Sequence, residues 1–417
     1  MASLIKNAPP CPLIVVFSIG HRGPVYRNFI TKNGALPTGS GAAIIEKKGE
    51  WFVFGPADKK LGFGFMRLPM KGDEVDIETA SRMVDEFLAA GFCYFDTAHG
   101  YHDGKSEAAL KAALTSRYPR EKYILADKLS PPYFEKEADI RPLFEQQLEA
   151  CGVEYFDMYL MHAQSAGRFE FYKSCRAYET AFALKAEGKV RHVGISFHDT
   201  AEVLERILTE YPQLDFVQLQ FNYLDFEDPQ VQSRACYEVC RRHHKPVIVM
   251  EPVRGGRLAQ LPDEARALLA KVSDSSPAAF ALRFAADFEG VKMVLSGMST
   301  PEQMEENLRV MGSLSPLSDR ERAAVEPLRR ILTAQQLVQC TACGYCTSGC
   351  PASIRIPDRF AAYNARLRGE ADAAARYAAV PGGEASACVG CGACEKTCPQ
   401  KLPIRKLLAL AAQEFEA

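Results

Sequence analysis

The sequence predicts an α/β protein, a (β/α)8 TIM barrel followed by a small, mostly helical and cysteine-rich domain. From residue 61 to about residue 310, an apolar run, a turn and an amphipathic helix recur eight times, which indicates parallel β/α units. Eight units in about 250 residues fit a closed barrel better than an open sheet. An open doubly wound sheet would also need a glycine-rich turn after its first strand, whereas Gly62 and Gly64 lie inside that strand.

The individual elements follow from the apolar pattern. Candidate strands cover residues 61–65, 93–98, 123–129, 155–163, 190–197, 216–222, 247–253 and 291–298. Amphipathic spacing predicts helices that include residues 76–90, 106–116, 138–151, 200–210 and 230–243. Barrels of this kind carry their chemistry at the carboxyl ends of the strands. That rule selects a set of polar residues: Asp96, Tyr101, Lys128, His162, Ser196, His198, Gln218, Asn222, Glu251 and Ser296.

We expect four segments along the chain. They are an N-terminal extension with little periodicity (1–58), the barrel (59–315), a charged helical linker (316–335) and the cysteine-rich domain (336–417). In the last of these, alanine-rich residues 357–377 predict a helical pair, and residues 404–415 predict a final amphipathic helix. Because the connection is helical and poor in glycine, we expect the two domains to touch.

Eight of the fourteen cysteines form two runs near the C-terminus, each with the pattern C-x-x-C-x-x-C-x-x-x-C-P. Bacterial-type ferredoxins use this spacing to hold two [4Fe–4S] clusters, and the fourth cysteine of each run ligates the other cluster. Two structural zinc sites are the alternative, but zinc seldom takes a third close cysteine. We assign one cluster to Cys340, Cys343, Cys346 and Cys398, and the second to Cys388, Cys391, Cys394 and Cys350.

Composition disfavours several kinds of partner and compartment. With 50 basic and 52 acidic residues, the chain has no electrostatic footprint for nucleic acid. No apolar run approaches the roughly 20 residues of a membrane span, and no signal peptide is recognisable. The other six cysteines are scattered, which disfavours a disulfide framework. We therefore expect a protein of the cytoplasm.

Residues 95–101, Phe-Asp-Thr-Ala-His-Gly-Tyr, closely resemble the D-T-A-x-x-Y signature of the aldo-keto reductase family. Further matches to the family pattern stand at four other strands, in residues 61–64, 126–128, 160–162 and 193–196. The resemblance covers about residues 61–310. The cysteine-rich tail is similar to the ferredoxin-type domain that is fused to one branch of this family.

The resemblance implies a catalytic tetrad at the barrel mouth. Tyr101 would be the general acid that protonates a carbonyl oxygen, and Lys128, held by Asp96, would lower the pKa of the tyrosine. His162 would orient the carbonyl by a hydrogen bond. Each residue alone could be structural, but four at successive strand ends favour catalysis. Loops 164–171 and 254–275 are expected to shape the pocket, and three nearby histidines either line it or lie in plain loops: His99, His102 and His198.

The resemblance also implies a nicotinamide coenzyme across the mouth. Its contacts would be Ser196 and Gln218 at the carboxamide, Met250 at the ring, Gly255 at the pyrophosphate, and Glu306 with Asn307 at the adenosine. The chain departs from the family pattern at three kinds of position. Met250 replaces a stacking aromatic residue, Phe197 replaces an asparagine, and Gln303 and Gly297 replace basic residues that clamp the 2′-phosphate of NADPH. These departures favour NADH, or weaker nicotinamide binding.

Three functions are compatible with these patterns. The first is an NAD(P)H-dependent oxidoreductase that reduces a small carbonyl compound or oxidises an alcohol. Its clusters would be structural, regulatory or able to exchange electrons with an external electron-transfer protein. The second is a ferredoxin-fed reductase that uses the clusters as its electron source without hydride transfer. The third is a non-catalytic redox-sensing binding protein, which the intact tetrad disfavours. Because a hydride carries two electrons and a cluster one, direct coupling needs a converter such as a flavin, and no flavin motif is visible.

Overall fold

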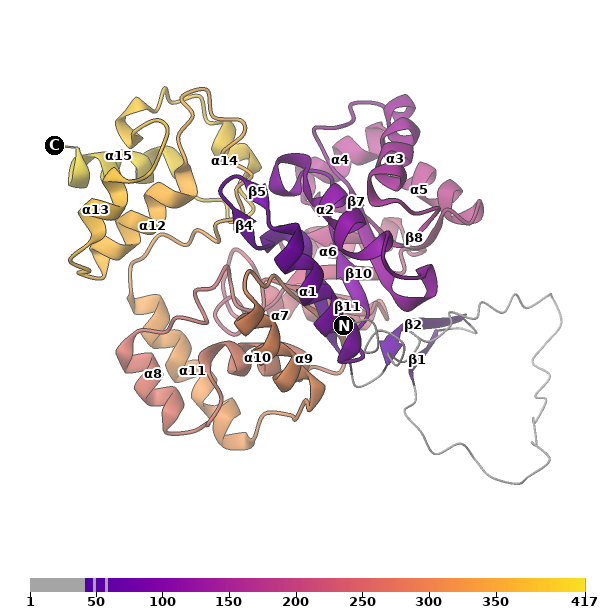
Figure 1. The fold of residues 1–417 in the computed structure, drawn as a ribbon, viewed down its shortest axis with the longest axis horizontal. Coiled ribbons are helices and arrows are strands. Elements are labelled where there is room, and N and C mark those ends of the chain that lie inside the picture. Colours follow the sequence, from indigo (N-terminus) through magenta and orange to yellow (C-terminus); the bar gives the residue numbers. More distant parts are fainter. Residues whose placement is uncertain (1–41, 48–49, 57–58, 417) are drawn as a thin grey trace.

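A closed barrel of eight parallel strands forms the centre of the computed structural model, which describes residues 42–47, 50–56 and 59–416 (Figure 1). The strand order around the barrel is β10-β11-β12-β3-β6-β7-β8-β9. The strands are β3 (Leu61–Gly64), β6 (Tyr94–Asp96), β7 (Ile124–Leu129), β8 (Phe156–Gln164), β9 (Val190–Phe197), β10 (Phe216–Gln220), β11 (Val247–Met250) and β12 (Val291–Ser296). Each coincides with one predicted strand, so the barrel prediction is confirmed.

Burial on both faces explains why these strands read as apolar runs instead of alternating patterns. Every residue of β7 and β8 is buried, as is typical of parallel strands that are covered by helices. The barrel strands share one large core with the inner faces of the surrounding helices. The carboxyl ends of all eight strands therefore meet at one mouth.

Helices surround the barrel: α1 (Ile77–Ala89), α2 (Ser106–Leu110), α3 (Glu137–Cys151), α4 (Ala166–Ser174), α5 (Ala177–Ala186), α6 (Ala201–Glu210), α7 (Ser233–Arg242), α8 (Asp263–Ala270), α9 (Pro277–Ala286) and α10 (Pro301–Gly312). A π-helical turn, η4 (Lys111–Thr115), continues α2, and short 3-10 turns lie at η2 (Phe65–Arg67), η3 (Tyr101–Gly104) and η5 (Arg120–Lys122). Helices α9 and α10 each begin at a proline after a capping Ser276 or Thr300, whose hydroxyl accepts a backbone N–H. Proline in the first helical turn loses no internal hydrogen bond, so these caps fix where both helices start.

Two antiparallel hairpins lie outside the barrel: β1 (Ala42–Lys47) with β2 (Glu50–Pro56), and β4 (Met70–Lys71) with β5 (Glu74–Val75). The first belongs to the predicted N-terminal extension, and its Phe54 is buried in the barrel core. The rest of segment 1–58 lies outside the described residues. The described part of the extension thus packs as a flap on the barrel.

The segment predicted as a linker is α11 (Asp319–Ala334), and it packs on the barrel. Ser318 and Glu321 form a capping box at its start. Leu328 and Leu332 on its inner face belong to the barrel core. Physically, this helix is part of the barrel domain, and the chain crosses over only after it ends.

The C-terminal domain contains α12 (Ile356–Leu367), α13 (Ala373–Ala378), the 3-10 turn η6 (Ala385–Ala387), α14 (Ala393–Thr397) and α15 (Ile404–Phe415). Helices α12 and α13 are the predicted helical pair, and α15 is the predicted final helix. The domain has its own small core, which includes Ile354, Phe360 and Leu408. Figure 1 shows it as a compact yellow unit beside the barrel.

The two domains touch, as expected. Arg254 and Arg257 of the barrel both donate to the side chain of Gln339. Lys401 pairs with Asp199 at 2.7 Å. These polar contacts hold the C-terminal domain over the barrel mouth.

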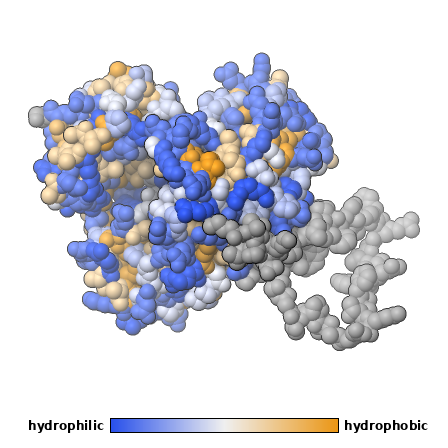
Figure 2. Space-filling model, viewed as in Figure 1, coloured by the Kyte–Doolittle hydropathy of each residue, from blue (hydrophilic) through white to orange (hydrophobic). Residues whose placement is uncertain are grey.

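The surface is largely polar on the face that Figure 2 shows. Large exposed apolar residues are scattered, with Val389 and Leu367 among the most exposed. Among the described residues, no helix combines the length and apolar character that crossing a bilayer requires.

A buried carboxylate on β8 allows a test of the barrel's stability. Asp157 is 1% exposed, pairs with Arg120 and Arg191, and accepts the backbone N–H of Leu125. We expect Asp157→Asn to lower the free energy of unfolding by about 3 kcal/mol or more, because both guanidinium groups lose their buried partner. Urea titration followed by far-UV circular dichroism, at matched iron content, measures this.

The control is Glu187→Gln, which removes an ion pair with Arg141 in which both side chains are about half exposed. This variant should lose less than about 1 kcal/mol. Equal losses for the two variants would contradict the assignment of Asp157 as a buried anchor.

Candidate active site

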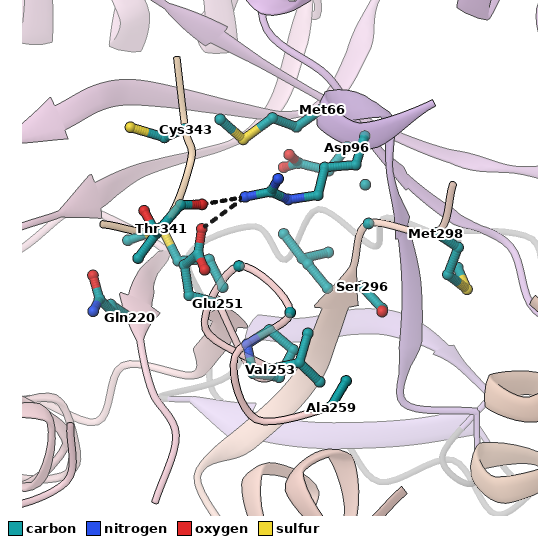
Figure 3. Close-up of a pocket in the computed structure, with 18 of the residues that line it drawn as sticks. Met66, Asp96, Gln220, Glu251, Val253, Ala259, Ser296, Met298, Thr341 and Cys343 are labelled. Carbon is teal, nitrogen blue, oxygen red and sulfur yellow. Dashed lines mark hydrogen bonds and ion pairs between the residues drawn. The ribbon is translucent and has the colours of Figure 1, made fainter. Parts of the chain in front are cut away.

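A cavity of about 410 Å³ lies at the carboxyl ends of the barrel strands (Figure 3). Its floor consists of residues from the strand ends and the loops that follow them. Its roof comes from the C-terminal domain, which contributes Thr341, Cys343, Tyr345, Pro399 and Gln400. In Figure 3, Cys343 and Thr341 lie across the cavity from Ser296 and Met298. The cavity is therefore enclosed between the two domains.

Most predicted site residues meet in this cavity. Three of the four predicted catalytic residues line it, namely Asp96, Tyr101 and His162. All six predicted coenzyme contacts line it as well: Ser196, Gln218, Met250, Gly255, Glu306 and Asn307. His198, Glu251, Ser296, Gly297 and Gln303 complete the set of singled-out residues at its wall.

Other expected pocket residues are not at the cavity wall. Asn222 is fully buried and donates to Asp225 and to the carbonyl of Glu251, so it holds the mouth together. His99 bonds to Glu107 at 2.9 Å, and His102 accepts the backbone N–H of Leu68. Both histidines fix loops.

The expectation for the loop at 164–171 is also wrong. This segment contains the start of α4, which turns Phe169 into the barrel core, and none of its residues lines the cavity. The loop at 254–275 does contribute, through Gly255, Gly256 and Ala259.

Lys128 lies buried beneath the cavity, next to Tyr101. Its Nζ donates to Asp96 Oδ1 and to the carbonyl of Thr97, both at 2.6 Å, and lies 4.8 Å from the centre of the Tyr101 ring. The pairing of β6 with β7 brings these strand ends together. A buried ammonium needs such partners, and they fix its charge beside the phenol.

The predicted lowering of the Tyr101 pKa is not found. Burial raises the pKa of Tyr101 well above its usual value, and the negative charge of Asp96 adds to this. The ammonium of Lys128 is already paired with that carboxylate, which offsets its effect on the phenol. Tyr101 therefore keeps its proton at neutral pH, as a proton donor must.

His162 is held from several sides. Its Nδ1 lies 2.5 Å from Ser130 Oγ, and its backbone N–H donates to the hydroxyl of Tyr172. Burial, with the nearby charge of Lys128, lowers the pKa of His162 well below its usual value. The ring is therefore neutral, and its Nε2 edge faces the cavity beside the hydroxyl of Tyr345.

The predicted coenzyme contacts are positioned by polar neighbours. Ser196 Oγ accepts the N–H of Ala163 at 2.7 Å, which leaves its hydroxyl proton free to donate. Gln218 Nε2 donates to Asp96 at 3.2 Å. Farther along the cavity, Asn307 donates to Ser296 at 3.0 Å.

Sequence reasoning missed Arg67, which follows the first barrel strand on η2. Its guanidinium donates to the carbonyl of Thr341 at 2.6 Å and lies 3.9 Å from Glu251. Its stem covers Gly297, where an added Cβ would lie 3.0 Å from Arg67 Cβ. A basic residue three positions after the end of β3 was the available signal.

Gly255 allows the roof to approach the rim. Its φ is +63°, and an added Cβ would lie 2.4 Å from the carbonyl oxygen of Thr341. The backbone of Thr341 therefore lies so close to Gly255 that no side chain would fit between them.

The eight C-terminal cysteines line two small cavities, four in each. Cys340, Cys343, Cys346 and Cys398 line one of them. Cys350, Cys388, Cys391 and Cys394 line the other. The two groups are the sets assigned to the two clusters from spacing, and each contains one cysteine from the opposite run.

Burial disfavours the thiolate form of the first cysteine set. Burial raises the pKa of Cys340 to about 11, and that of Cys343 and Cys346 to about 12. Thiolates are the ligands that iron–sulfur clusters need. At these positions the positive charge of iron would be what stabilises them.

Comparisons with known proteins match both halves of the chain. The model of the Aldo/keto reductase family matches residues 60–330, and the model of the 4Fe-4S dicluster domain matches residues 339–402. One curated relative, the NADH-specific methylglyoxal reductase of Escherichia coli, is 26% identical over 300 residues, covering 60% of this chain and 89% of its own.

Solved structures agree in fold. An aldo-keto reductase from Klebsiella pneumoniae in complex with NADPH has a TM-score of 0.53 at 21% identity, covering 65% of this chain and 90% of its own. The holo form of an aldo-keto reductase from Bacillus halodurans has a TM-score of 0.55 at 24% identity. The match covers 70% of this chain and 96% of the other.

The pairing of cysteines across the two runs can be tested by mutation. We expect anaerobically purified Cys398→Ser to lose about half of its iron and sulfide, because one of two four-iron clusters loses a ligand. Cys343→Ser should lose the same half, and the double variant should lose no more. Iron and sulfide assays with the visible spectrum measure this.

Cys175→Ser is the control, since Cys175 is buried in the barrel domain, where its thiol donates to the carbonyl of Glu135. Complete loss of iron in the Cys343→Ser, Cys398→Ser double variant would contradict the pairing. Zinc in place of iron in the unmodified protein would contradict the clusters themselves.

Proposed function

Because the chain belongs to the aldo/keto reductase family, and is on that ground an oxidoreductase, we propose that it reduces a small carbonyl compound, or oxidises the alcohol, with a nicotinamide coenzyme. One observation carries this proposal. The phenol of Tyr101, the buried Lys128 and the neutral ring of His162 meet at one end of a cavity that extends to Glu306 and Asn307. The reaction needs a proton donor and a cavity long enough to bind the coenzyme beside it.

The residues have distinct roles in this reaction. A bound reduced nicotinamide supplies the hydride that adds to the carbonyl carbon. Tyr101 gives its proton to the carbonyl oxygen, and the ammonium of Lys128 stabilises the phenolate that remains. Asp96 holds that ammonium in place. His162 orients the carbonyl oxygen through Nε2 while Ser130 fixes the other side of its ring.

We propose NADH as the preferred coenzyme. Among the described residues that line the cavity, Arg67 is the only lysine or arginine, and it already binds Thr341 and faces Glu251. Gln303 stands where the family pattern has a basic residue, and its side-chain oxygen accepts the backbone N–H of Ser299. The 2′-phosphate of NADPH would gain little binding energy here, because strong phosphate recognition relies on bidentate hydrogen bonds from a guanidinium group. The name of the Escherichia coli relative, an NADH-specific reductase of methylglyoxal, supports both the coenzyme and a small carbonyl substrate.

The acid role of Tyr101 has a direct test. We expect Tyr101→Phe to lower kcat for methylglyoxal reduction by about 100-fold or more, because the phenol proton is lost and the binding groups are kept. Affinity for NADH, measured by its fluorescence, should change little.

The control is Tyr363→Phe in the C-terminal domain, where the ring packs on Phe415 away from the cavity. Unchanged turnover by Tyr101→Phe with every carbonyl tried would refute the proposed function.

A second candidate is a cluster-fed reductase, and a specific observation favours it. Cys343 borders both the reaction cavity and the first cysteine set. In the second set, Cys391 is exposed, and its neighbour Val389 is 69% exposed. This arrangement supports a path from an external electron carrier through both clusters to the barrel. Reducing one carbonyl on this path takes two single electrons and two protons.

Anaerobic mixing separates the two candidates. Under the hydride proposal, NADH added to iron-replete protein binds, with a change in its fluorescence, and leaves the visible cluster absorbance unchanged. This follows because a hydride carries two electrons and each cluster accepts one.

Cys398→Ser serves as the control for the optical signal of the first cysteine set. Bleaching of the clusters by NADH would contradict separate roles. Absence of NADH binding would favour the cluster-fed scheme.

A further inference from the structure

Tyr345 enters the catalytic centre from the other domain. It lies between Cys343 and Cys346, and its hydroxyl lies 3.4 Å from His162 Nε2. The two rings meet edge to face, with centroids 6.0 Å apart at 84°. The side chains of Tyr345 and Tyr101 line the same cavity, and Tyr345 acts against the rise in the pKa of Tyr101. None of the roles assigned above uses this residue.

The position of this hydroxyl coincides with the place that a substrate needs. A carbonyl oxygen must lie within hydrogen-bond reach of the group that protonates it and of the group that orients it. Those groups are Tyr101 and His162 in the proposed function. The oxygen of Tyr345 lies 3.4 Å from His162 Nε2, in the cavity that Tyr101 also lines, so it and a carbonyl oxygen exclude each other.

We propose that Tyr345 is a gate and a specificity-determining residue, whose hydroxyl stands in for the carbonyl oxygen and is displaced when substrate binds. This inference rests on the proposed function. The substrates that it admits are small, unhindered carbonyl compounds such as 2-oxoaldehydes. The oxygen of such a compound can take the place of the Tyr345 hydroxyl, because the compound has no bulky substituent that would collide with the Tyr345 ring.

The contacts of Tyr345 suit displacement. A length of 3.4 Å is at the weak end for a hydrogen bond, and both of its partners are uncharged. A carbonyl oxygen that takes over these contacts keeps Tyr101 and His162 paired. The exchange therefore costs only the contacts of the Tyr345 hydroxyl itself.

The backbone next to Tyr345 gives the ring room to move. Gly344 has φ +80°, and an added Cβ there would meet no atom within 4 Å. The segment is anchored before this point, where Thr341 accepts from Arg67 and touches Gly255. The ring can thus shift while the domain stays seated. Because Cys343 and Cys346 are assigned to one cluster, that cluster would fix the loop that carries the gate.

Two variants and a binding probe test the gate. For methylglyoxal, Tyr345→Phe should lower KM about tenfold with kcat unchanged, because the ring loses the hydrogen bonds that hold it in place. Tyr345→Ala should lower KM at least as much and should also turn over acetophenone, for which we expect no turnover by the unmodified protein. Acetate, titrated into the complex with NADH and followed by fluorescence, should bind both variants about tenfold more tightly.

Ser348→Ala is the matched control, since Ser348 is exposed in the same cysteine run and has no side-chain bond to the barrel. Iron content and the visible spectrum verify that all variants hold their clusters. Unchanged KM and unchanged acetate affinity in both variants would overturn the gate. A loss of kcat in Tyr345→Phe as large as in Tyr101→Phe would overturn it too, because Tyr345 would then belong to the proton path. Failure of the proposed function is separate, since it shows in Tyr101→Phe.

Discussion

One buried carboxylate connects the floor of the cavity to its roof. Asp225 is 1% exposed and accepts hydrogen bonds from Gln220, Asn222 and Arg254, all between 2.7 and 2.8 Å. Arg254 then donates to Gln339, the residue before the first cysteine run. A buried ion pair of this kind stabilises only when its remaining donors and acceptors are satisfied, and here they are. The mouth, the rim and the cysteine segment are thereby held as one unit, and the cavity depends on that unit.

Within the cavity, the resting charge is balanced. Lys128 is paired with Asp96, burial keeps the proton on Tyr101, and burial keeps His162 neutral. In the proposed reaction, charge appears only when a proton leaves the phenol, at a point where the ammonium is already in place. Such preorganised dipoles and charges stabilise a developing charge without reorganising at the moment of reaction. The pKa of Tyr101 is raised because burial and the negative charge of Asp96 outweigh the lowering by Tyr345.

Local patterns in the sequence predicted the features that depend on local structure. Apolar runs gave the barrel strands, and barrel topology then placed Asp96, Tyr101 and His162 at one mouth. Cysteine spacing grouped the thiols, because three close ligands and one distant one are a property of the turn. Residues that act through neighbours distant in sequence were not predictable. Tyr345 reaches the site, and Arg67 finds its partner Thr341, only because the domains meet. The pKa of Tyr101 depends on burial that no motif encodes.

The roof of the cavity is covalently attached to its floor. Helix α11 packs on the barrel, and the chain continues directly from it into the cysteine segment. Two separate proteins would come apart on dilution, and the share of closed sites would follow their concentrations. Here the local concentration of roof at each barrel is set by a short tether. The ratio of one roof to one barrel is therefore independent of how much protein a cell makes.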